Sequence, residues 1–168
     1  MEPVTLAFQY TEASYVRGVR EYTRYAKIIR RFDPLIALLL AALSIVYWVL
    51  SGQNVWSIVM MVVAGFALLL GLYVYFAAPK RAFREQKYQE PYTLVFSEEG
   101  IHFTTPTIDS RLAWATYRGI WSSDAYYFLI QNRHVYTLLP KSAFSSEEQR
   151  KRFEALATKH IGPIAQKR

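Results

Sequence analysis

The chain of 168 residues contains no cysteine. Disulfides, thiolate nucleophiles and cysteine-ligated metals are therefore excluded, and the composition suits a reducing compartment. The three histidines, His102, His134 and His160, stand far apart in the sequence, without a second histidine at the spacing of a zinc-binding pair. We predict no metal site.

Motifs of common enzyme chemistry are also missing. The seven glycines form neither a phosphate-binding loop nor the G-x-S-x-G turn of a serine hydrolase. Asp33 stands where a helix is expected to begin, Asp109 in or beside a predicted strand, and Asp124 in a predicted turn. We therefore expect no catalytic residue and no cofactor, and we predict that the protein is not an enzyme.

Two long stretches, residues 35–50 and 55–78, lack charge altogether. A helix needs roughly 20 apolar residues to cross a hydrocarbon core of about 30 Å. The second stretch exceeds this length, whereas the first reaches it only when Pro34 and Ser51-Gly52 are included. We predict a transmembrane hairpin over residues 34–78, with helices at about 34–52 and 55–78. Because neither span carries a charge, the hairpin alone offers no ion pathway.

Positive charge gathers on both sides of the predicted hairpin, within an N-terminal region, residues 1–33, and a connector, residues 79–91. The turn between the helices has none. The basic residues next to the spans are Arg17, Arg20, Arg24, Lys27, Arg30 and Arg31 before the first, and Lys80, Arg81, Arg84 and Lys87 after the second. By the positive-inside rule, both flanks and both termini should be cytoplasmic.

The N-terminal region begins with a predicted strand at residues 4–10, where apolar and polar side chains alternate. Thr11 is a candidate N-cap, and Tyr15 and Tyr22 belong to an apolar stripe at helical spacing in a basic amphipathic helix that extends to Arg31. Such a helix either lies on anionic lipid or packs its aromatic stripe against the protein while its arginines set the topology. We favour packing.

The C-terminal region, residues 92–168, consists of short strands separated by turns and followed by one helix. Six strands are predicted, at residues 92–97, 100–105, 107–115, 116–122, 125–131 and 134–139. Ser145 and Glu148 have the spacing of a capping box, which predicts a helix to about Ile161. Antiparallel strands closed by a helix indicate an α+β fold with a small barrel or bent sheet, as in pleckstrin-homology-like domains. Since about 77 residues make a marginal core, we expect the strand at 4–10 to join the sheet as a seventh strand.

Four segments carry a resemblance to a known family. They are Glu98-Glu99-Gly100-Ile101, Leu112-Ala113-Trp114 before Tyr117, Tyr126-Tyr127-Phe128-Leu129-Ile130, and Leu139-Pro140-Lys141-Ser142-Ala143-Phe144. In these segments and in its order of strand, helix, hairpin and C-terminal domain, the chain resembles the bacterial YcxB-like family. The resemblance implies a multi-pass protein of the bacterial plasma membrane with a cytoplasmic pleckstrin-homology-like domain. It supplies no catalytic residue.

These patterns predict a membrane-anchored, non-catalytic interaction module that binds a protein or peptide partner at the inner face of the plasma membrane. An exposed strand edge is the expected docking site. Two alternatives stay open: a sensor of anionic lipid, with the ten flanking basic residues as lipid contacts, and an accessory subunit of a larger membrane complex.

Three further expectations concern ligands and partners. Lys141, after Pro140, is a candidate contact for an anion. Residues 92–168 carry ten basic and seven acidic side chains, an excess too small to predict binding of nucleic acid. The oligomeric state, including a homo-oligomer, stays open.

Overall fold

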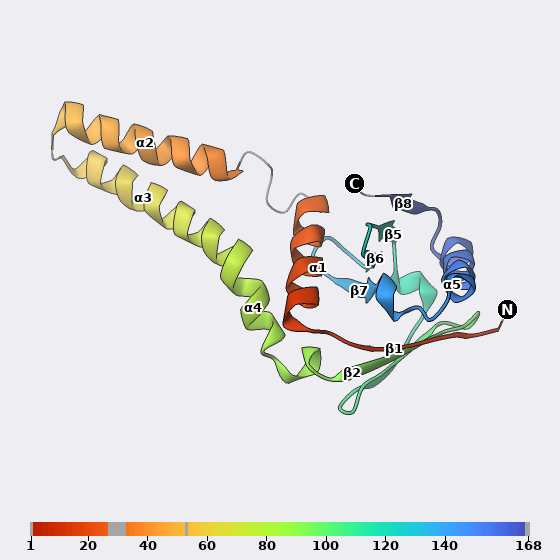
Figure 1. The fold of residues 1–168 in the computed structure, drawn as a ribbon. Helices are drawn as coiled ribbons and strands as arrows, with labels where there is room; N and C mark the ends of the chain where they lie inside the picture. The colour runs from red at the N-terminus through yellow and green to blue at the C-terminus, as the bar shows by residue number, and fades with distance from the viewer. Residues whose placement is uncertain (1, 27–32, 53, 167–168) are drawn as a thin grey trace. The chain divides into compact units, whose positions relative to one another are not determined.

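The computed structural model describes residues 2–26, 33–52 and 54–166 (Figure 1). The chain divides into two compact units. The first, called here the β unit, contains Met1–Tyr22 and Phe83–Arg168, and the second, the helical unit, contains Thr23–Ala82. The N-terminal strand therefore folds with the C-terminal region, although the helical unit separates them in sequence.

The helical unit contains the two apolar stretches as α2 (Asp33–Ser51) and α3 (Val55–Leu72). The helices pack against each other, with Ser44 and Ala64 buried. Gly52 follows α2 with a φ of 68°, a left-handed conformation that glycine adopts easily. Asn54 then caps α3, because its side chain accepts a hydrogen bond from the Ser57 amide at 2.9 Å while the Ser57 hydroxyl accepts from the Asn54 amide at 3.2 Å. A short turn thus joins the two apolar helices.

One described helix is long and apolar enough to cross a membrane. It runs through 29 residues from Val55 to Phe83, and the mean hydropathy of its most apolar window is 2.5. The apolar part of α2, Leu38–Ser51, is shorter. By length and composition the structure therefore supports one candidate span, and the two-span hairpin stays a prediction.

The long helix passes through Pro79, which lies in the predicted connector. A π-helical turn, η1 (Tyr73–Ala77), follows α3 and continues directly into α4 (Ala78–Phe83). Proline lacks an amide proton and its ring crowds the carbonyl four residues earlier, so a wider turn just before Pro79 accommodates it. The helix thus ends at Phe83, beyond the predicted end of the span at residue 78.

The β unit contains two four-stranded sheets. The strand order of sheet A is β1 (Val4–Gln9), β2 (Pro91–Phe96), β3 (Ile101–Thr104) and β4 (Asp109–Leu112). The order of sheet B is β7 (Tyr136–Pro140), β6 (Tyr126–Ile130), β5 (Gly119–Ser122) and β8 (Ile164–Gln166). All six strands predicted in the C-terminal region are present, and the third and fourth are shortened around a 3₁₀ turn, η3 (Trp114–Thr116). The predicted α+β class with antiparallel strands is confirmed, while β8, which pairs with β5 in parallel, was not predicted.

Strand β1 joins sheet A as expected. It pairs antiparallel with β2 in a register that places Val4 opposite Phe96 and Leu6 opposite Leu94. All four of these side chains are buried in one hydrophobic cluster. The predicted seventh strand is therefore confirmed, since residues from both ends of the chain share one core.

Helix α5 (Glu147–His160) supplies the other part of that core. The Phe153 ring lies 4.9 Å from that of Phe96 in sheet A and 5.2 Å from that of Tyr127 in sheet B, measured between centroids. The cap differs by one residue from the prediction of Ser145 with Glu148. Ser146 is the N-cap, and its hydroxyl accepts from the Gln149 amide at 3.1 Å.

Helix α1 (Glu12–Tyr25) packs against sheet B, the alternative that we favoured. Thr11 caps it as predicted, through reciprocal bonds with Ser14 at 3.1 and 3.2 Å. Tyr22 is buried and its hydroxyl donates to the Arg133 carbonyl at 2.8 Å. A Cβ on Gly18 would lie only 2.5 Å from a Leu138 methyl carbon, so glycine permits close approach of the helix to β7. The predicted continuation to Arg31 falls on residues 27–32, outside the described part.

Candidate functional site

The basic residues predicted as lipid contacts lie on the surface wherever the structure describes them. Arg17 is paired with Glu21 at 3.1 Å, and Lys87 with Glu85 at 2.8 Å. The other described members are Arg20, which is half-buried, and Arg24, Lys80, Arg81 and Arg84, which are exposed. Lys27, Arg30 and Arg31 lie outside the described residues. Contact of these residues with lipid stays a prediction.

Lys141, the predicted anion contact, lies in a 3₁₀ turn, η4 (Lys141–Ala143). Its ammonium nitrogen is 4.8 Å from the centroid of the Tyr127 ring, which is within the range of a cation–π contact. Burial lowers the pKa of this ammonium group, and the nearby charge of Arg150 lowers it further. In the structure the lysine thus faces an aromatic ring, and contact with an anion is untested.

Two histidines have carboxylate partners. His102 Nε2 lies 2.6 Å from Asp109 Oδ1 across strands β3 and β4, and His160 Nε2 lies 2.9 Å from Glu98 Oε2. Within residues 2–26, 33–52 and 54–166 no three side chains of His, Asp or Glu gather as a ligand set for a metal. Neither histidine contact belongs to such a ligand set in this part of the chain.

Glu98 connects the turn after β2 to the C-terminal end of α5. Its carboxylate accepts from Lys159 at 2.8 Å as well as contacting His160, whose ring stacks on Trp114 at 5.3 Å. The hydrogen bonds from Lys159 and His160 lower the pKa of the Glu98 carboxyl to about 2. This cluster fixes the last turn of α5 against sheet A.

The two sheets have four edge strands, β1, β4, β7 and β8, and two of these edges receive hydrogen bonds from side chains. Gln149 donates to the Thr5 carbonyl of β1 at 2.8 Å, and the Tyr10 hydroxyl donates to the Leu138 carbonyl of β7. Strand β4 carries exposed charges at Asp109 and Arg111, which discourage pairing with a further strand. The remaining edge is that of β8.

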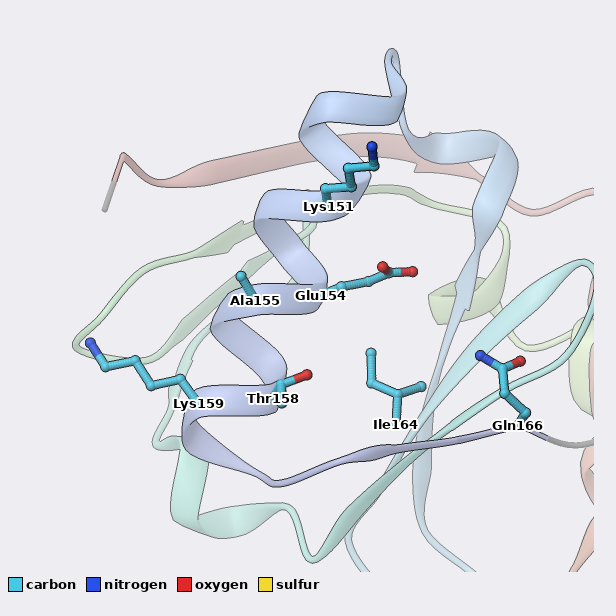
Figure 2. Close-up of a pocket in the computed structure, with 7 residues that line it drawn as sticks. All are labelled: Lys151, Glu154, Ala155, Thr158, Lys159, Ile164 and Gln166. Atoms are coloured by element: carbon cyan, nitrogen blue, oxygen red, sulfur yellow. The ribbon is translucent and has the colours of Figure 1, made fainter.

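A groove of about 600 Å³ lies between β8 and α5. Its lining residues are Lys151, Glu154, Ala155, Thr158 and Lys159 from the helix, and Ile164 and Gln166 from the strand (Figure 2). The Glu154 carboxylate and the Ile164 side chain both point into the gap between helix and strand. Glu154 accepts a hydrogen bond from the buried Tyr127 hydroxyl, so the floor of sheet B holds this carboxylate in place.

The sequence did not predict this groove, because it depends on β8. A three-residue strand has too few positions for alternation to be recognised, and Pro163 just before it indicates only that the helix has ended. One indirect signal was available. Without β8, strand β5 would form an unpaired edge of sheet B.

Comparison with known proteins gives one family match. Residues 96–157, from the end of β2 to near the end of α5, match the family model described as YcxB-like protein. No curated protein and no solved structure matches the chain. The matched segment excludes the apolar helices, so the membrane context is not part of the match. The resemblance to the YcxB-like family is confirmed over residues 96–157.

Proposed function

We propose that the protein is a membrane-anchored, non-catalytic interaction module. In this proposal an extended segment of a partner protein adds to the outer edge of β8 and lies in the groove beside α5. The observation that carries the proposal is an edge strand, β8, that borders a groove and receives no side-chain hydrogen bond on its backbone within the described residues. Addition of a strand to such an edge supplies backbone hydrogen bonds, and an adjacent groove supplies selectivity for side chains.

The lining of the groove suits a peptide better than a reaction. Ala155 and Thr158 are small and exposed, so an extended chain can approach α5 closely. Lys151 has no ion pair in the described part of the chain, whereas Lys159 is occupied by Glu98. An acidic side chain of the partner would therefore form an ion pair with the Lys151 ammonium group.

The architecture of the β unit is compatible with this role. Four antiparallel strands, then three more and a closing helix, have the order expected of a pleckstrin-homology-like domain, an analogy of fold that by itself assigns no function. The apolar helices α2 and α3, flanked by basic residues on both sides, would anchor this unit as a two-span hairpin at the cytoplasmic face of the plasma membrane.

Site-specific photo-crosslinking in native membranes tests the proposal. A photoreactive residue at Ala165 of β8 should yield a reproducible crosslinked protein, whereas the same residue at Arg111 of edge strand β4 should not. Thr158→Trp should abolish the crosslink because the indole obstructs the approach of an extended chain to α5, while Glu148→Trp, at an exposed position in the first turn of α5, should leave it unchanged. Absence of any product at Ala165, or a product that is unaffected by Thr158→Trp, contradicts binding at this edge.

A further inference from the structure

A second cavity, of about 480 Å³, lies inside the β unit among α1, sheet A and β7. Its lining is mainly aromatic and comes from segments far apart in sequence: Tyr10, Tyr15, Val19, Lys87, Tyr88, Tyr92, Phe103, Ile108, His134, Val135, Tyr136, Thr137 and Leu138. The volume falls in the range of roughly 300 to 1,000 Å³ that is usual for small-molecule sites. The cavity is distinct from the groove beside β8.

Two of the tyrosine hydroxyl groups that line the cavity already donate hydrogen bonds within the protein. Tyr10 donates to the Leu138 carbonyl, and Tyr92 donates to the Lys87 carbonyl. The Tyr15 ring lies 4.7 Å from that of Tyr88. Burial raises the pKa of the Tyr10, Tyr15 and Tyr92 hydroxyls, which therefore stay uncharged at neutral pH. An apolar chain is the group that such walls accommodate.

The mouth of the cavity has the opposite character. Lys87, His134 and the apolar Ile108 and Val135 are exposed there, and no carboxylate is among the described lining residues. The Lys87 ammonium group lies 4.9 Å from the Tyr88 ring centroid, and Glu85 outside the cavity is its ion-pair partner. An apolar interior with a basic mouth is complementary to an amphiphile with an anionic head.

The wall of this cavity also meets the end of the long apolar helix. Phe83 is the last residue of α4, and its ring lies 5.7 Å from that of Tyr15, which lines the cavity. If the apolar helix spans a bilayer, as proposed above, its end at Phe83 lies near the interface. The basic side chains of Arg84 and Lys87 follow directly along the chain.

We propose that this cavity binds an anionic phospholipid of the membrane that holds the protein. One acyl chain lies among the tyrosine rings, and the phosphate lies at Lys87 and His134. The proposal rests on the membrane anchor of the proposed function but not on peptide binding at β8. A bound lipid would contact α1, sheet A and β7, which together surround the cavity.

The full-length protein in nanodiscs of phosphatidylcholine and phosphatidylglycerol provides the test. A phosphatidylglycerol with a photoreactive diazirine in one acyl chain should crosslink to cavity residues, identified by mass spectrometry of the digested protein. Lys87→Glu should lower the yield at those residues by at least about fivefold, the factor that corresponds to about 1 kcal/mol. Arg118→Glu, which makes the same charge change at an exposed position outside the cavity and outside the groove beside β8, should leave the yield unchanged.

The outcomes separate this proposal from the anchor. Crosslinks confined to residues 55–83 would contradict the lipid site while supporting the anchor. Cavity crosslinks that are unaffected by Lys87→Glu, or that are equally frequent with a photoreactive phosphatidylcholine, would contradict recognition of an anionic head. No crosslink at either place would contradict both the anchor and the site.

Discussion

At the scale of single residues, Glu98 shows how one side chain fixes the position of a helix. Its carboxylate contacts two neighbouring residues of α5, Lys159 and His160, and the latter stacks on the buried Trp114. The Trp114 indole donates in turn to the Ser97 carbonyl at 2.8 Å. The groove beside β8 depends on this position of α5, and one of the two residues that contact the carboxylate, Lys159, also lines that groove.

The lowered pKa of Glu98 makes its contribution to stability dependent on pH. The pKa falls from 4.5 to about 2 on folding, so the contribution is fully present above about pH 4.5 and is lost as the pH falls toward 2. We expect Glu98→Gln to lower the melting temperature of the β unit at pH 6. The difference from the unmodified protein should shrink steadily between pH 4.5 and pH 2.

Thermal unfolding of the detergent-solubilised protein, followed by near-ultraviolet circular dichroism, measures this difference. Glu99→Gln, which alters the exposed neighbouring carboxylate, is the matched control and should change the melting temperature little. A difference for Glu98→Gln that stays constant over the whole pH range would show that the carboxylate charge has no part in the contact.

At the scale of elements, β1 shows that the β unit depends on a strand that lies far from the other strands in sequence. Its buried side chains pack beside those of β2 on the same face of sheet A. About 80 residues of sequence separate the two strands. Deletion of β1, or a substitution that weakens its packing, should therefore destabilise the domain that contains the family match at residues 96–157.

The substitution Leu6→Ala tests this dependence. Leu6 is only 1% exposed and packs in the cluster that contains Leu94 and Phe153. Removal of its branched methyl groups should lower the free energy of unfolding of the β unit by about 2 to 5 kcal/mol, measured by denaturant titration. The exposed neighbour provides the control, since Thr5→Ala should have a much smaller effect. Equal effects of the two substitutions would contradict burial of β1 in the shared core.

The elements differ in how much of them the sequence predicts. Strand β1, the strands β2 to β7 and α1 follow from alternation, turn signals or helical spacing, and the joining of β1 to the sheet follows from the need of a small domain for more core. Strand β8 is too short to show a period. The aromatic cavity requires contact between residues such as Tyr10 and Leu138, which are 128 positions apart, and no local pattern contains that information.

At the scale of the whole molecule, the chain forms two compact units. The β unit contains both the N-terminal and the C-terminal parts of the chain, and the helical unit contains the part between them. Such an arrangement suits a membrane anchor, because insertion of a hairpin leaves both ends of the chain on the same side. The described residues contain one helix that is long and apolar enough to span, and the basic flanks of the apolar segments predict the direction. The proposed peptide and lipid sites both require this predicted topology in order to act at the cytoplasmic face.

The absence of cysteine makes the topology directly measurable. Single cysteines replace Ser51, at the end of α2, or the exposed Ser142 of the β unit, and spheroplasts of a bacterial host are treated with a membrane-impermeant maleimide before and after lysis. The account predicts that the cysteine at position 51 is labelled in intact spheroplasts, whereas the cysteine at position 142 is labelled only after lysis. Labelling of position 142 in intact spheroplasts, or labelling of both positions only after lysis, would contradict a hairpin that holds the β unit in the cytoplasm.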